Sequence, residues 1–419
     1  MSCWQVSCGY RSGFCLHYPA NNISLTPKSV TNQAAFPRIP HPRLFVLRKR
    51  LALRLTLIAM TALLLIPAFA VAVLGVGVLG AYGAWVIFGT KWPLVGLLLG
   101  VSSISATGFV AVRLFSVLFV PLPLPGGVRL SSEDACYLHR LIEGTAWVLE
   151  AGRIDHVWIT PDMNAAILQR PRRGIFGRIE THLLIGLPLM HSVTCPQLLA
   201  VLSHELAHLA TQRKGAAKYG ALLRAWWLRA LDRIGDVFPS IGAQADCWLS
   251  RFYSNMARLT RIEEFEADAY ATKAVDAELL GETLIEVSIK EQFLSRDYWP
   301  RVLAQSMVRA KPLVRPFRDL CLGMAAGFMR HAATDEVLSS NEPLPQPMHP
   351  TTRERLSALH VSPTVSPSDL PTAASHYLSP LLLTLAWVFD RAWWGDVRPD
   401  WQFTYRTARR EHRRRRHRR

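Results

Sequence analysis

The sequence predicts a mainly α-helical protein with a small β-sheet, placed behind an N-terminal hairpin of two transmembrane helices. Two long uncharged segments within the first 112 residues predict the hairpin. Two short segments rich in β-branched and aliphatic residues, 156–160 and 181–187, predict strands. From Pro196 onward, apolar residues recur at helical spacing. A helical domain with few strands therefore follows the hairpin.

The first uncharged segment runs from Leu55 to Thr90, and its 36 residues exceed the roughly 20 that a helix needs to cross a bilayer. We expect one span and then a glycine-rich turn region, with Gly75, Gly77, Gly80 and Gly83. A second uncharged segment, Leu94 to Val112, predicts the return span. The length of the first segment and its start after residue 50 argue against a secretory signal peptide. Buried helices of a soluble core are the alternative.

Basic residues lie on the open side of this hairpin. Five Lys or Arg occur between residues 43 and 54, and Arg113 and Arg129 follow the second span, whereas Lys91 alone lies between the spans. The positive-inside rule therefore predicts a multi-pass protein of the cell (inner) membrane, with the domain after residue 120 facing the cytoplasm. An organelle presequence in the acid-free N-terminus is the alternative.

The net charge of +17 is concentrated at the two ends of the chain. Residues 405–419 carry nine Arg and one Glu, and no Asp or Glu precedes Glu133. A disordered tail that contacts anionic lipid explains this distribution better than a nucleic-acid-binding face. Hydrophobic residues make up 50% of the chain, which excludes disorder throughout, and seven cysteines in 419 residues exclude a disulfide scaffold.

The composition divides the chain into five regions. Proline and glycine between residues 121 and 127 mark a linker after the hairpin. Two later apolar segments, 217–235 and 377–389, are too short or too charged to span a bilayer, so each is either interfacial or buried. We expect a basic N-terminal segment (1–50), the hairpin (51–120), a catalytic domain (121–360), a helical extension (361–404) and the Arg-rich tail (405–419).

The pentapeptide His204-Glu205-Leu206-Ala207-His208 has the pattern HExxH and lies within the helical segment. Four residues of helix advance about 6 Å and slightly more than one turn, so both imidazoles project from one face. This spacing is suited to one Zn²⁺, and Glu205 lies close enough to contact a water at the metal.

A third ligand must come from elsewhere, because Thr211 and Lys214 occupy the places of the Gly and His in the longer HExxH motif. The next acidic cluster is Glu263-Glu264-Phe265-Glu266-Ala267-Asp268. Glu264 and Asp268 are four residues apart, so one helix face can present a ligand and a carboxylate that supports another ligand. A solvated acidic helix face is the alternative.

HELAH at 204–208 followed by EFEAD at 264–268 resembles the integral-membrane zinc peptidases related to HtpX and the CAAX prenyl protease, which are gluzincins. Asp162-Met163-Asn164-Ala165 resembles their Asn-Ala segment, and the stretch from His349 to Leu356 resembles their His-Pro…Arg element. The resemblance implies one Zn²⁺ per chain, the metal ligands His204, His208 and Glu264, the catalytic base Glu205, and a supporting role for Asp268. It also implies substrate contacts at Asn164 and Ala165 and active-site roles for His349 and Arg355.

The sequence therefore predicts a membrane-bound zinc endopeptidase, in which Glu205 assists the attack of a zinc-bound water on a peptide bond. Membrane or misfolded proteins are the expected substrates, and the lipid bilayer is the other expected partner. A catalytically inactive membrane scaffold or chaperone is the alternative. A nucleic-acid-binding membrane protein is disfavoured, because the Arg-rich tail lacks interleaved aromatic residues.

Overall fold

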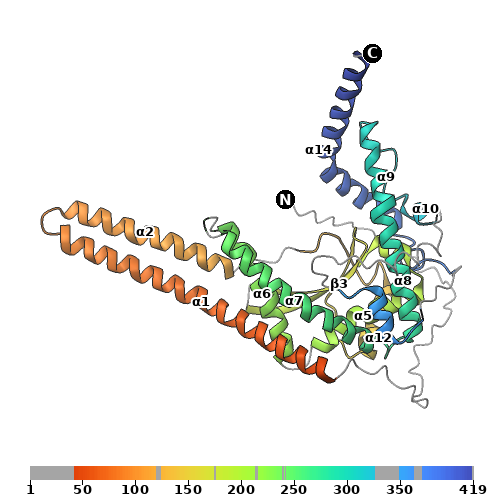
Figure 1. The fold of residues 1–419 in the computed structure, drawn as a ribbon, viewed down its shortest axis with the longest axis horizontal. Coiled ribbons are helices and arrows are strands. Elements are labelled where there is room, and N and C mark those ends of the chain that lie inside the picture. Colours follow the sequence, from red (N-terminus) through yellow and green to blue (C-terminus); the bar gives the residue numbers. More distant parts are fainter. Residues whose placement is uncertain are drawn as a thin grey trace. The chain divides into compact units, whose positions relative to one another are not determined.

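The structure is a computed structural model that describes residues 42–118, 124–173, 176–212, 216–237, 240, 242–325, 349–362 and 370–417. All of these belong to one unit, residues 37–419. The predicted class is confirmed, since a small sheet accompanies many helices (Figure 1). The strands are β1 (Val128–Leu130), β2 (His156–Thr160), β3 (Ala165–Arg173) and β4 (Phe176–Gly186).

The helices up to Phe293 are α1 (Pro42–Phe88), α2 (Pro93–Leu118), α3 (Cys136–Val148), α4 (Leu187–Ser192), α5 (Cys195–Gln212), α6 (Ala216–Val237), α7 (Gly242–Ala271) and α8 (Ala277–Phe293). A π-helical turn (Leu294–Tyr298), α9 (Trp299–Ala304) and a 3₁₀ turn (Gln305–Met307) continue α8. The remaining helices are α10 (Leu320–Ala325), α12 (Thr352–Leu359), α13 (Ala373–Tyr377) and α14 (Leu382–His417).

The N-terminal hairpin consists of α1 and α2, which pack along each other (Figure 1). The expected glycine-rich turn region is wrong, because α1 is one helix of 47 residues that continues through these glycines to Phe88. A side chain at Gly77 would collide with Thr107, and one at Gly80 would meet Ser103. These two glycines therefore allow close approach of the two helices, as small residues do in membrane helix pairs.

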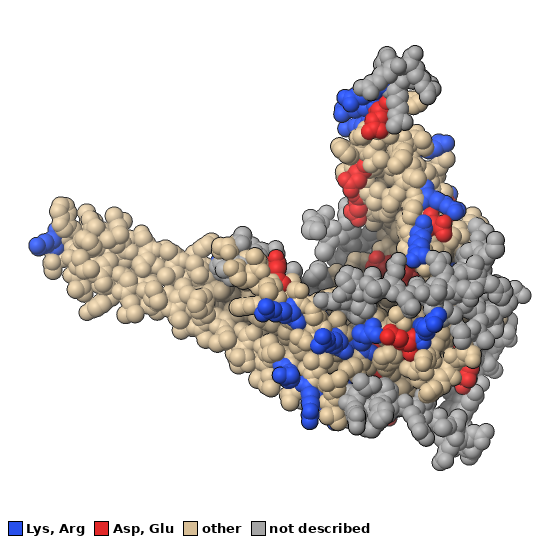
Figure 2. Space-filling view, viewed as in Figure 1, with Lys and Arg blue, Asp and Glu red and all other residues tan. Residues whose placement is uncertain are grey.

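Both hairpin helices are long and apolar enough to cross a membrane by length and composition. Only 22% of the most apolar window of α1 and 17% of that of α2 are buried within the structure, so most of both windows is exposed. Lys91 is the one charged residue between Arg54 and Arg113. The surface of the hairpin in Figure 2 is accordingly uncharged over most of its length.

The four strands form one sheet in the order β1-β2-β4-β3. The β2–β4 pair is parallel, and the β1–β2 and β3–β4 pairs are antiparallel. Alternate residues of β2 and β4, namely Val157, Ile159, Leu183 and Ile185, are buried in the main core. The predicted strands 156–160 and 181–187 are thus confirmed, although the second is longer and ends at Gly186. β3 lies at an edge of the sheet.

The main core joins this face of the sheet to α3, α4, α5, α13 and the start of α14. Segment 377–389, expected to be either interfacial or buried, is buried through Leu378, Leu385 and Phe389. Beyond it, α14 continues as a helix to His417. The expectation of a disordered tail is therefore wrong for the described residues 405–417, which prolong α14.

A second core lies at the base of the hairpin. Trp226, Trp227 and Leu231 of α6 pack with Leu55 and Ala59 of α1. Segment 217–235 was expected to be either interfacial or buried. It buries one face against α1 and α7. The N-terminal half of α1 thus packs against α6 and α7 as well as forming the start of the hairpin.

Candidate metal centre and active site

Helix α5 places the HExxH residues at the centre of the domain. Leu198, Leu202 and Leu206 are fully buried and fix this helix against the core. His204 and His208 project together, with their ring centroids 4.8 Å apart and their two Nε2 atoms 3.2 Å apart. The helical spacing alone predicts this pairing.

Helix α7 brings Glu264 to the same point. Its Oε2 lies 3.4 Å from His204 Nε2, and its Oε1 lies 3.3 Å from His208 Nε2. Ligand atoms around a tetrahedral metal ion, with bonds of about 2.0–2.1 Å, are separated by about 3.3–3.4 Å. The three side chains would therefore fit one divalent metal ion.

Asp268, one turn after Glu264, sets the tautomer of His204. Its Oδ1 lies 2.9 Å from His204 Nδ1. An ionised carboxylate only accepts hydrogen bonds, so His204 Nδ1 carries the proton and donates it to Asp268. The lone pair of His204 is then on Nε2, which faces Glu264 and His208, and this is the form that binds a metal ion.

Arg355, on α12, holds Asp268 in turn. Its Nε lies 2.8 Å from Asp268 Oδ2, and its Nη2 lies 2.5 Å from Oδ1. Burial by itself would raise the pKa of Asp268, but the Arg355 charge and the hydrogen bonds from Arg355 and His204 lower this pKa to about 2. Asp268 is therefore an anion at any physiological pH, as its role as acceptor requires.

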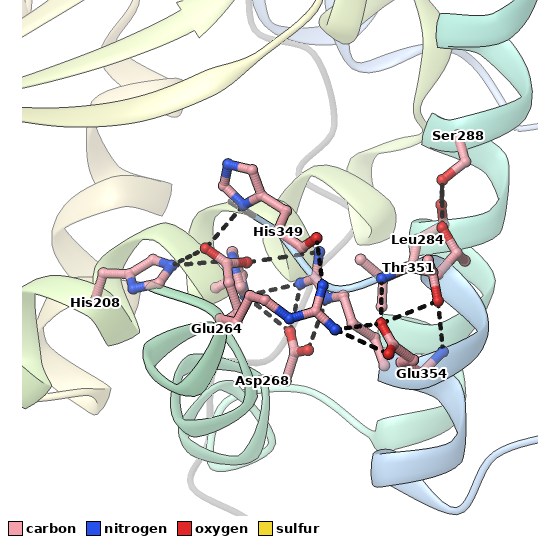
Figure 3. Close-up of polar contacts among 12 residues, drawn as sticks. His208, Glu264, Asp268, Leu284, Ser288, His349, Thr351 and Glu354 are labelled. Carbon is pink, nitrogen blue, oxygen red and sulfur yellow. Dashed lines mark hydrogen bonds and ion pairs between the residues drawn. The ribbon is translucent and has the colours of Figure 1, made fainter. Parts of the chain in front are cut away.

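His349 approaches Glu264 from the other side, with its Nδ1 3.1 Å from Oε1 (Figure 3). Its side chain is 69% exposed, so it borders the open part of the site.

The backbone after His349 is fixed by a capping box, in which Thr351 Oγ1 accepts from the Glu354 amide and Glu354 accepts from the Thr351 amide. Arg261 on α7 binds the Glu354 carboxylate at 2.8 and 2.9 Å. The Thr-x-x-Glu pattern at 351–354 is the sequence signal for this arrangement.

A cavity of about 590 Å³ lies in front of these residues. Its walls include His204, Glu205, His208, Glu264, His349 and Arg355, and also Asn164 and Ala165 at the start of the edge strand β3. Burial raises the pKa of the Glu205 carboxyl, against the opposing effect of the two histidines. The structure thus brings all nine predicted site residues to one place, with Asp268 behind the cavity wall.

A second group with metal-binding residue types occurs at His156, Glu180 and His182. Here Trp158 Nε1 lies 3.0 Å from His182 Nδ1. The indole N–H can only donate, so Nδ1 is the acceptor and the proton of the neutral ring is on Nε2. His182 then has no free lone pair on the nitrogen that faces Glu180, and this group does not fit a metal ion.

Sequence reasoning missed an ion-pair cluster beside Glu264. Arg48 of α1 lies 3.0 Å from Glu266 and 3.9 Å from Glu263, and Arg224 of α6 lies 3.8 Å from Glu263. Arg224 also donates to Thr56 of α1 at 2.9 Å. The hairpin is thereby joined to the helix that carries Glu264. The sequence contains no local signal for it, because the partners come from three separate helices.

Residues 177–362 match the model of a protein family described as Peptidase family M48. This segment contains the HExxH helix, α7 and α12. The match supports a metal-dependent peptidase, a hydrolase that acts on proteins or peptides. No match was found among the curated proteins or among the solved structures.

Proposed function

We propose that this protein is a membrane-bound zinc endopeptidase of the HtpX or CAAX prenyl protease type, with one Zn²⁺ held by His204, His208 and Glu264. The observation that carries the proposal is the set of mutual distances of 3.2–3.4 Å among the three ligand groups. The tautomer that Asp268 imposes on His204 gives independent support, because it turns the lone pair toward that point.

When bound, zinc supplies a Lewis acid that polarises the peptide carbonyl and lowers the pKa of a water molecule. Glu205 takes the proton of the attacking water and passes it to the leaving amine. Its buried position at the cavity wall, which raises the pKa of the carboxyl, suits a group that must hold a proton during the reaction.

We assign different tasks to the two basic residues of the His-Pro…Arg element. His349 borders the open part of the cavity, so it is the donor for the oxyanion of the tetrahedral intermediate. Arg355 is a positioning residue, since its guanidinium is engaged by Asp268 at two points.

Substrate binding is assigned to the edge strand β3. Ala165 to Gln169 line the cavity, and one side of this strand has no neighbouring strand in the part of the chain that the structure describes. An extended peptide can add to such an edge through backbone hydrogen bonds, starting at Asn164 and Ala165. Recognition through the backbone tolerates many sequences, which suits a protease that removes membrane or misfolded proteins.

In this proposal the hairpin anchors the domain in the membrane, and the basic residues at its base support a position at the cytoplasmic face. The function is tested with purified protein in detergent, by measuring zinc content and casein cleavage in the wild type and in Glu205→Gln. We expect both proteins to hold one zinc per chain and only the wild type to cleave casein. Cleavage by Glu205→Gln at the wild-type rate contradicts the assigned base, and a zinc-loaded wild type that cleaves nothing favours the scaffold alternative.

A further inference from the structure

The wall of the catalytic cavity contains three arginines, which differ in their partners. Arg355 is engaged by Asp268, and Arg224 lies near Glu263 and donates to Thr56. The third, Arg229 on α6, lies against the ring of Trp226 at 5.8 Å. Among the residues that the structure describes, no carboxylate lies within 4.0 Å of the Arg229 guanidinium.

Arg229 is half-buried, and burial lowers the pKa of its guanidinium. A cation that loses water without gaining an anion is destabilised, and a cation–π contact compensates only a part of this. The side chain borders both the catalytic cavity and a smaller hollow that contains Asp246. Asp246 is exposed and does not form an ion pair with it. An anion entering the catalytic cavity would therefore find a guanidinium that no described carboxylate neutralises.

The rise of a helix gives approximate distances along α6 and α7 between the proposed metal ligands and Arg229. α6 and α7 pack on each other (Figure 1), and Arg224 lies beside Glu263, next to Glu264. Arg229 is five residues further along α6, about 7.5 Å. The cavity reaches Met256 on α7, eight residues or about 12 Å before Glu264. An extended peptide advances about 3.3 Å per residue, so the distance of about 12 Å along α7 corresponds to three or four residues.

We infer that Arg229 binds a carboxylate of the peptide substrate, three or four residues from the cleaved bond. The inference rests on the proposed function, because the occupant of this cavity is taken to be a peptide. The carboxylate belongs either to an Asp or Glu side chain or to the C-terminus of the substrate, and both present the same planar anion to the guanidinium.

The test uses the full-length protein with Glu205→Gln in detergent, loaded with zinc, so that binding is measured without turnover. Fluorescent peptides carry a single Glu, or Gln as its match, at each position up to five residues on either side of the central bond. A parallel set ends in a free carboxylate or in an amide. We expect one position, three or four residues from the centre, at which the carboxylate lowers Kd about tenfold, a change of about 1.4 kcal/mol.

The Kd ratio compares the peptide without the carboxylate with the matched peptide that has it. The added substitution Arg229→Gln should bring this ratio close to one, and Arg229→Glu should reverse the preference in favour of a Lys peptide. Arg233→Gln, an exposed arginine one turn further along α6, is the matched control and should keep the ratio. Zinc content and far-UV circular dichroism verify that each variant is folded. A wild-type ratio of one at every position, or a ratio that survives Arg229→Gln, overturns the inference. Neither result depends on casein cleavage, which tests the proposed function separately.

Discussion

Arg355 and Asp268 form a two-point ion pair, with Nε–Oδ2 at 2.8 Å and Nη2–Oδ1 at 2.5 Å. The two residues come from α12 and α7, and Asp268 in turn accepts from His204 on α5. One carboxylate therefore connects three helices and sets the protonation of a proposed metal ligand. The position of α12 and the chemistry of HExxH are linked through this contact.

Glu264→Ala should reduce zinc content to well below one per chain, because two histidines alone leave the site without its only anionic ligand. Glu278→Ala, an exposed acidic residue on α8, is the control and should leave zinc content unchanged. Metal analysis after dialysis against a weak chelator measures both. Full zinc occupancy in Glu264→Ala would mean that another group is the third ligand.

Arg355→Met should lower zinc affinity about 10–100-fold, which is the usual effect of losing a group that orients a metal ligand. The reason is that Asp268 remains buried without its cation and no longer holds His204 in the required tautomer. Competition with a fluorescent zinc chelator gives the affinity. Arg353→Met, which alters an exposed arginine on the same helix, should have no comparable effect.

Arg48→Met should destabilise the domain by about 2 kcal/mol, less than the 3–5 kcal/mol for a fully buried pair, because the partners retain some contact with solvent. Glu263 and Glu266 would lose the charge that compensates their burial. Thermal unfolding in detergent measures the change, with the exposed Arg50→Met as control. Equal melting temperatures for the two variants would show that the contact between α1 and α7 contributes nothing to stability.

Stability should decrease as the pH falls from about 6.5 to about 4, in part because of His191. Burial lowers the pKa of this imidazole to about 4, so the unfolded chain takes up the proton at a higher pH than the folded protein does. Between these two pH values one such group lowers the free energy of unfolding by about 1.4 kcal/mol for each pH unit. Below a pH of about 4 it lowers this free energy no further. His191→Gln should flatten the dependence of the melting temperature on pH, whereas the exposed His376→Gln should not.

Reporter fusions test the orientation of the hairpin. Fusions after residue 130 and at the C-terminus should report the cytoplasm, and a fusion near Lys91 should report the opposite side, because the basic residues lie at the open end of the hairpin. A signal from the opposite side at residue 130 would contradict both this orientation and the proposed cytoplasmic substrates.

Features that depend on neighbouring residues could be predicted without the structure. The lengths of the uncharged segments give two helices able to cross a membrane, and the i, i+4 spacing places His204 and His208 together, since both follow from the fixed rise and period of a helix. Strand 156–160 was equally predictable from its composition. The glycine-rich stretch and the Arg-rich tail were misread. Glycine disfavours helix in the first and repulsion between like charges disfavours it in the second, yet the structure continues α1 and α14 through them.

Which distant residues meet depends on how the helices and the sheet pack. Glu263, Glu264 and Glu266 are alike in sequence, yet the packing of α7 turns Glu264 toward His204 and His208 and turns the other two toward Arg48. The edge position of β3 and the placement of Arg229 at the cavity wall depend in the same way on how sheet and helices pack. Contacts between residues far apart in the chain are fixed by the burial of apolar faces in a shared core, and no short stretch of sequence contains that information.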